Sequence, residues 1–152
     1  MRFDLSDEVQ GTWFDFCTSE VKDGAVTFRD PVQGAGRVCL RLARGEVMEE
    51  IHRQTRRTVK EFVVNTKSRG MERVEYEDQT QEQKKKENEL IWDHAIQAWE
   101  GILDKDGNEI NCTAANKVKL MTIPQFSRFV VRCLNLLSSA SDEEAEGAIK
   151  NS

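Results

Sequence analysis

The spacing of apolar residues changes near residue 45, and this change limits the folds open to the chain. Before it, Val38, Leu40 and Leu42 alternate with other residues, which places them on one face of a strand. After it, apolar residues such as Val47 and Ile51 recur at steps of three and four, the spacing of an amphipathic helix. The sequence therefore predicts an α+β fold that is mainly helical, with a small β part at its N-terminus.

The N-terminal part, about residues 11–43, is expected to form a small antiparallel β-meander. Asp23-Gly24 lies inside it, and this dipeptide readily takes the positive φ values of a tight hairpin turn. The expected strands are rich in aromatic and β-branched side chains and cover residues 12–16, 26–28 and 38–42.

The helical part, about residues 46–138, is expected to contain three to four helices. The first spans about twenty residues from Glu46 and ends before Gly70, since a glycine past the last periodic residue suits a helix C-terminus. After a polar connector, a second helix runs from Gln79 to Ile102 and is amphipathic in its second half. The last helix keeps close to perfect three- and four-residue spacing at Phe126, Phe129, Val130, Cys133, Leu134 and Leu137.

An acidic stretch between these last two helices suggests a calcium loop, but its ligands are incomplete. If Gly107 is position 6 of an EF-hand loop, the ligand positions 1 and 12 fall on Ile102 and Thr113, which supply neither the first ligand nor the chelating carboxylate. A short β-hairpin near residues 102–110 that turns at Asp106-Gly107 explains more of the sequence.

Two residues mark the helices that follow this hairpin. Thr113 suits an N-cap, because its hydroxyl can accept a hydrogen bond from a free backbone N–H, and a short helix then reaches about Met121. Pro124 suits the first turn of the last helix.

The length of the chain fits one domain. With 152 residues, 38% of them apolar, it can bury a single core. Residues 1–138 are expected to form this single domain. Residues 139–152 are small, acidic and polar, and are expected to form a disordered acidic tail.

Charge and hydropathy exclude two classes of partner. The net charge of −5 argues against nucleic acid, because phosphate contacts need a clustered cationic face. No apolar run approaches the roughly 20 residues that cross a bilayer, and the N-terminus lacks the pattern of a signal peptide. The sequence therefore predicts a cytoplasmic protein that binds neither nucleic acid nor membrane.

No catalytic or metal-binding pattern stands out. The two histidines, His52 and His94, have no neighbouring nucleophile or paired carboxylate. Zinc ligands usually come in closely spaced pairs, and the cysteines do not, so buried thiols are the favoured interpretation. The cysteines are Cys17, Cys39, Cys112 and Cys133. We therefore expect no enzyme activity, no metal and no cofactor.

Four large aromatic residues are the candidates for contact with a partner. Trp92 and Trp99 lie seven apart on one side of the expected second helix, and Phe126 and Phe129 lie on the last helix. Large aromatics supply most of the buried area of a small domain, so core packing is the first interpretation and a partner-binding surface the alternative.

The order of these features resembles the tail assembly chaperone group of long-tailed bacteriophages. The resemblance covers about residues 10–138 and includes the segments GTWFDF and VTFRDP. It is carried by the residues Trp13, Phe14, Trp99, Gly101, Ile102, Asp104, Asp106, Gly107, Ile110, Cys112, Thr113, Asn116, Lys117, Pro124, Phe126 and Phe129.

This resemblance implies a non-enzymatic phage or prophage protein that acts in the host cytoplasm during virion morphogenesis and is absent from the mature virion. Its implied partners are the tail tape measure protein, which such chaperones are thought to coat, and the tail tube protein. Self-association is expected as well, because coating a long helix takes many copies. The alternative is a small cytoplasmic adaptor or regulatory module that binds another protein through the β-meander and has no role in virion assembly.

Overall fold

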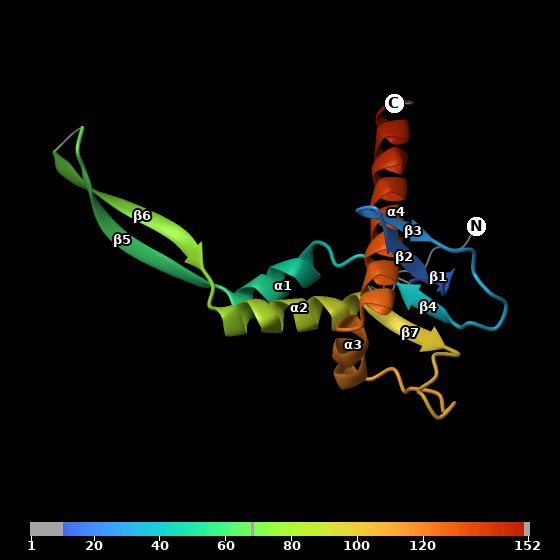
Figure 1. Cartoon of the computed structure of the whole chain (residues 1–152). Helices are drawn as coiled ribbons and strands as arrows, with labels where there is room; N and C mark the ends of the chain where they lie inside the picture. The colour runs from blue at the N-terminus through green and yellow to red at the C-terminus, as the bar shows by residue number, and fades with distance from the viewer. Residues whose placement is uncertain (1–10, 68, 151–152) are drawn as a thin grey trace. The chain divides into compact units, whose positions relative to one another are not determined.

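The computed structural model describes residues 11–67 and 69–150, and over these residues the fold is α+β with seven strands and four helices (Figure 1). In chain order they are β1 (Thr12–Asp15), β2 (Ser19–Lys22), β3 (Ala25–Phe28), β4 (Arg37–Leu40), α1 (Glu46–Thr55), β5 (Arg57–Asn65), β6 (Gly70–Asp78), α2 (Gln81–Ala95), β7 (Ile96–Glu100), α3 (Ala114–Met121) and α4 (Pro124–Lys150). The prediction of a mainly helical fold is wrong, because long stretches that read as helix or connector form strands.

The chain divides into two compact units, where the sequence predicts one domain over residues 1–138. The core unit combines the chain up to Ala43 with the chain from Trp92 onward. The arm unit is the intervening segment, Arg44–Ile91. Each unit is described by itself below.

Three strands of the core unit form an antiparallel sheet in the order β1-β4-β7. β4 is the middle strand, and its Val38 and Leu40 are fully buried. β2 and β3 form a separate hairpin, with φ values of 54° at Asp23 and 78° at Gly24 in its turn. The predicted turn is confirmed, but the predicted meander is wrong. β4 pairs with β1 on one edge and with β7 on the other, and β3 pairs only with β2.

In the arm unit, the predicted first helix is wrong in its second half. α1 ends at Thr55, and the following residues form β5, which pairs with β6 along nine residues of each strand. β6 takes the place of the predicted polar connector. Thr58, Val59, Phe62 and Val63 are β-branched or aromatic and favour a strand. Their apolar spacing alone does not separate a strand from a helix.

The predicted second helix, Gln79 to Ile102, is also wrong in its second half. α2 begins at a reciprocal cap, in which the Thr80 N–H donates to Gln83 Oε1 (2.9 Å) and the Gln83 N–H donates to Thr80 Oγ1 (3.1 Å). The helix ends at Ala95, and the next five residues form β7. β7 pairs with β4, and this pairing satisfies the backbone of a segment whose Ile96 is fully buried.

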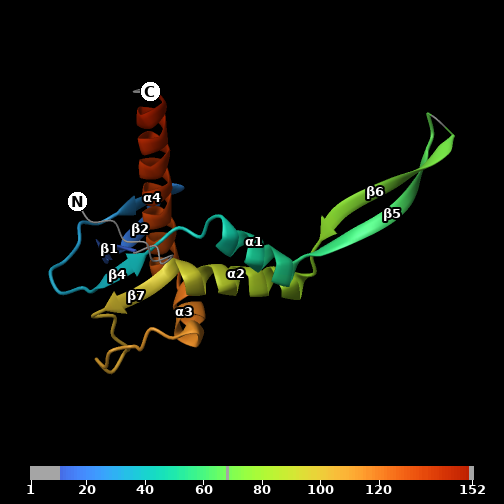
Figure 2. The same ribbon diagram turned by 180° about the vertical axis from the view of Figure 1, so that it is seen from behind.

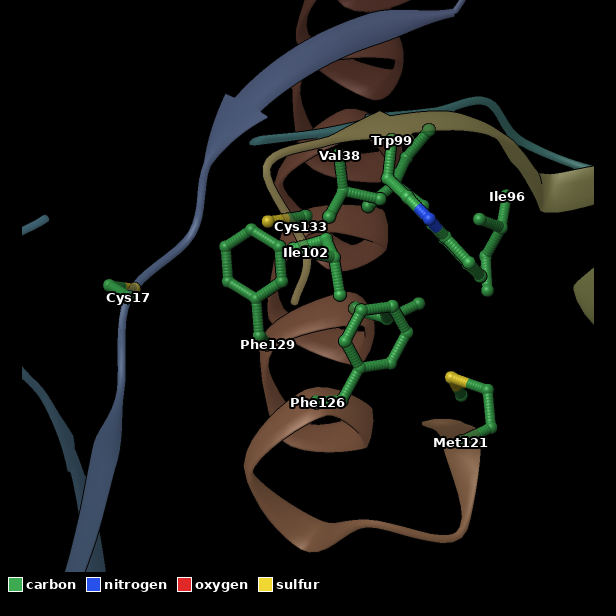
Figure 3. Close-up of a cluster of buried hydrophobic side chains, with 11 residues drawn as sticks. Cys17, Val38, Ile96, Trp99, Ile102, Met121, Phe126, Phe129 and Cys133 are labelled. Carbon is green, nitrogen blue, oxygen red and sulfur yellow. The ribbon is translucent and has the colours of Figure 1, made fainter. Parts of the chain in front are cut away.

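The core of the core unit lies between the central sheet and helices α3 and α4. In Figure 3, Phe126 and Phe129 of α4 point toward Val38 and Trp99 of the sheet. The rings of Trp99 and Phe126 meet edge to face with centres 6.0 Å apart. The buried cluster comprises Cys17, Val38, Leu40, Ile96, Trp99, Ile102, Met121, Phe126, Phe129, Val130 and Cys133.

The predicted hairpin near residues 102–110 is present. The Ile110 N–H donates to the Ile102 carbonyl oxygen (2.8 Å), and Leu103 and Glu109 form a single β-bridge. Gly107 takes a φ of 83° in its turn, as a hairpin of this kind requires.

The predicted helix boundaries after this hairpin are confirmed as well. The Asn116 N–H donates to Thr113 Oγ1 (3.2 Å), which makes Thr113 the N-cap of α3, and Pro124 is the first residue of α4. α4 continues as a helix to Lys150, where the sequence predicts a disordered tail over residues 139–152. Alanine and glutamate in this stretch are good helix formers. Residues 151–152 lie outside the described residues.

Within the arm unit, α1 and α2 lie side by side (Figure 2). Ile51 and Thr55 of α1 are buried, and so is the charged Glu87 of α2. Glu87 receives hydrogen bonds from Arg56 Nε (3.0 Å) and Lys84 Nζ (3.1 Å). Burial alone would raise the pKa of this carboxyl, but the hydrogen bonds from Lys84 and Arg56 outweigh it and lower the pKa below its usual value.

Candidate protein-binding site

The four aromatic residues singled out from the sequence lie in the core rather than on the surface. Trp99, Phe126 and Phe129 are buried, and Trp92 is half-buried against the same cluster. Trp99 is fixed further by its indole N–H, which donates to the Ile110 carbonyl oxygen (2.6 Å). Contact between these residues and a partner stays a prediction, and on this fold a partner meets other side chains first.

An open apolar groove lies between β3 and α4 in the core unit. Its volume is about 500 Å³. Val26 and Phe28 of β3 line one wall, and Val131 and Leu136 of α4 line the other. The remaining lining residues are Ser127, Arg128, Arg132, Asn135 and Ser139. Concave sites with mostly apolar walls and a few polar groups are typical binding sites in proteins.

The positive charge of the groove comes from two arginines of α4. The Arg132 guanidinium lies over the Phe28 ring, 4.5 Å from its centre, and donates to Cys17 Sγ (3.5 Å). Arg128 Nε donates to the Pro124 carbonyl oxygen (3.2 Å). Over the part of the chain whose side chains are described, neither arginine has a carboxylate within ion-pair distance. The groove therefore offers an apolar floor with two cations available to an acidic group.

The groove exists because α4 carries apolar residues outside its buried stripe. The stripe predicted from the sequence, which includes Phe129 and Cys133, faces the core. Val131 and Leu136 lie off this stripe and are about half exposed. The spacing of the buried stripe does not reveal these two residues, because they depart from its period. Apolar residues that depart from the period were the available signal.

A second apolar surface lies in the arm unit. β5 and β6 form a two-stranded ribbon in which no residue is buried. Phe62, Val64 and Met71 are the most exposed apolar side chains of the ribbon. Val63 and Tyr76 are less exposed. Apolar side chains gathered on an exposed element mark an interaction surface more often than scattered ones do.

The surroundings of the two histidines and of Cys133 follow from how the chain packs. His94 is half-buried, and burial and then the nearby Arg41 lower its pKa. His52 Nε2 lies 3.4 Å from the buried Glu87. Burial raises the pKa of the Cys133 thiol to about 12, which keeps it protonated and unreactive near neutral pH. Among the described residues, no group of three histidine, cysteine or acidic side chains is placed to hold a metal ion.

None of the helices that the structure describes is long and apolar enough to cross a membrane. The chain matches the model of one protein family, described as YdaY prophage protein, over residues 43–151. The matched range contains the whole arm unit and continues through α4, whereas β1 to β4 lie outside it. Neither the curated proteins nor the solved structures contain a match to the chain.

Proposed function

This chain belongs to the YdaY prophage protein family, and on that premise we propose that it is a non-enzymatic tail assembly chaperone of the prophage. In this role it binds the tail tape measure protein and brings tail tube subunits to it. Its place of action is the host cytoplasm during virion morphogenesis. The groove between β3 and α4 is the observation that carries the proposal.

The shape and chemistry of the groove suit one class of ligand, an amphipathic helix. Such a helix presents apolar residues at steps of three and four, which match apolar walls such as those formed by Phe28 and Leu136. A long amphipathic helix also has an exposed apolar stripe that would aggregate without a partner. A protein that covers this stripe keeps the helix soluble until assembly.

The positive charge of the groove further limits the kind of helix that we expect to bind. Arg128 and Arg132 line the groove and have no carboxylate partner among the described side chains. A helix with glutamate or aspartate beside its apolar stripe would supply those partners, with the acidic groups kept at the wet rim. The preferred segments of the tape measure protein are therefore amphipathic and acidic.

Binding of tape measure segments to the purified full chain tests this proposal. Helical segments of the tape measure protein encoded by the same prophage would be titrated into the protein by calorimetry. We expect acidic amphipathic segments to bind. Leu136→Lys should weaken this binding at least about tenfold, because it places a charge in the apolar wall.

Leu103→Lys is the matched control. Leu103 is also about half exposed and belongs to the core unit, but it lies in the hairpin of residues 102–110, away from the groove lining. It should change the affinity by less than about twofold. Absence of binding by any tape measure segment would refute the chaperone proposal. Recovery of only a host protein, through the first 45 residues, would favour the adaptor instead.

A further inference from the structure

The ribbon formed by β5 and β6 has too little support to be stable by itself. Its strands pair over nine residues each, yet neither contributes a buried residue. An isolated two-stranded ribbon is at best marginally stable in water, and it gains stability when further strands or another layer pack on it. The ribbon therefore lacks a partner that covers one of its faces.

The two faces of the ribbon differ in charge. Residues directly opposite each other in an antiparallel pair point to the same face. The Phe62 face carries Thr58, Lys60, Phe62 and Val64 of β5 with Met71, Arg73, Glu75 and Glu77 of β6. The Tyr76 face carries Arg57, Val59, Glu61, Val63 and Asn65 of β5 with Gly70, Glu72, Val74, Tyr76 and Asp78 of β6. Positive and negative side chains balance on the Phe62 face, whereas the Tyr76 face has one positive and three negative side chains.

The Phe62 face also holds the most exposed apolar cluster of the ribbon. Val64 and Met71 are a directly opposed pair, each 68% exposed, and Phe62 beside them is 67% exposed. On the opposite face, Val63 is only 47% exposed. Close to the cluster, Glu75 lies 3.6 Å from Lys60 and 3.5 Å from Arg73, and together with Glu77 these side chains give the face two negative and two positive charges.

We propose that the Phe62 face binds the Phe62 face of a second copy of this chain. The whole chain carries a net charge of −5, so two copies repel each other on average. The Phe62 face is balanced in charge and apolar at its centre, so it can meet itself without like-charge repulsion. A two-fold axis then lets the same patch serve both copies. The two ribbons form a two-layer structure at the usual sheet spacing of about 10 Å.

The alternative occupants fit less well. A cationic partner would select the acidic Tyr76 face, and an acidic partner would find equal numbers of both signs on the Phe62 face. Pairing of strand edges between copies would not require Phe62, Val64 and Met71 to be apolar, since edges join through backbone hydrogen bonds.

Analytical ultracentrifugation of the full chain at a series of micromolar concentrations tests this inference. We expect the wild-type protein to form a dimer and Val64→Lys to weaken it at least about tenfold. Val63→Lys is the matched control, since it introduces the same charge one residue away on the opposite face. It should leave the dimer unchanged. Circular dichroism would verify that both variants are folded.

A second variant covers the case in which Val64→Lys damages the ribbon itself. Lys60→Glu leaves the apolar cluster intact but makes the Phe62 face acidic, so it should also weaken the dimer. A monomeric wild-type protein overturns the proposal, and so does a dimer that resists both substitutions or responds equally to Val63→Lys. The groove takes no part in this dimer, so the titration with tape measure segments tests the proposed function separately.

Discussion

Glu87→Gln should destabilise the arm unit, because it removes a buried charge that three basic side chains surround. The Glu87 side chain is only 2% exposed. Its Oε1 lies 2.9 Å from Arg56 Nη2 and 3.4 Å from His52 Nε2, and its Oε2 lies 3.1 Å from Lys84 Nζ. Glutamine keeps the shape of the side chain but cannot balance the charges of Arg56 and Lys84.

The size of the expected loss in stability depends on how much stabilisation the two cations regain from other partners or from water. Breaking a fully buried ion pair by removing one member costs about 3–5 kcal/mol. Here Arg56 keeps a second partner, Glu77, at 3.1 Å, and Lys84 is largely exposed to water. Because both cations regain part of their stabilisation, we expect a loss of about 2 kcal/mol in the free energy that opens the arm unit.

Amide hydrogen exchange in α1 and in the first eleven residues of α2 measures this free energy directly. A local measurement is preferable because two units need not unfold in one step. The pKa of Glu87 in the folded chain lies below its usual value, so its stabilisation is present above the ordinary carboxyl pKa of about 4.3. It is lost as the pH falls through the lower folded value. The difference between wild type and variant should therefore shrink in acid.

Glu82→Gln provides the control, since Glu82 lies on the same helix but is exposed. Glu82→Gln should change the free energy that opens the arm unit, as measured by hydrogen exchange, by less than about 0.5 kcal/mol. Equal protection of wild type and Glu87→Gln at neutral pH would refute the reasoning. A difference that persists unchanged at acidic pH would show that the charge of Glu87 is not its cause.

Three further predictions concern the core unit. Phe129→Ala should lower the free energy of unfolding by about 3–5 kcal/mol in urea denaturation, because Phe129 is almost fully buried. Gly36→Ala should lower the melting temperature more than Gly34→Ala; both glycines have positive φ, but only at Gly36 would a Cβ approach another backbone, 2.8 Å from the Gly101 carbonyl oxygen. Cys133 should resist alkylation at mildly alkaline pH in the folded protein and react after denaturation, as mass spectrometry can show, since its pKa is about 12.

Features decided by neighbouring residues were predictable from the sequence. The Asp23-Gly24 turn, the Thr113 cap and the Pro124 helix start depend on local backbone chemistry, and all three are present. Features decided by distant partners were not predictable. Trp99 reads as part of a helical stripe, but it lies in a strand that pairs with Val38, and a single sequence does not reveal this pairing.

The candidate site shows the same division. The buried stripe of α4 was predictable from spacing, and its aromatic residues were natural candidates for partner contact. The groove was not predictable, because Val131 and Leu136 become a wall only when Val26 and Phe28 lie opposite them. The ribbon was not predictable for another reason. Because neither face of β5 is buried, its apolar and polar residues do not alternate in the way that indicates a strand.

The strand order β1-β4-β7 sets the time at which the core unit can form during translation. Ile96 of β7 follows its partner Leu40 of β4 by about 56 residues. Because ribosomes add about 5–20 residues per second, β7 is synthesised roughly 3 to 11 s after β4. The entire arm unit is made within this interval and its contacts are local, so it can fold first. In the nascent chain, the edge of β4 that later pairs with β7 therefore stays unpaired until β7 is synthesised.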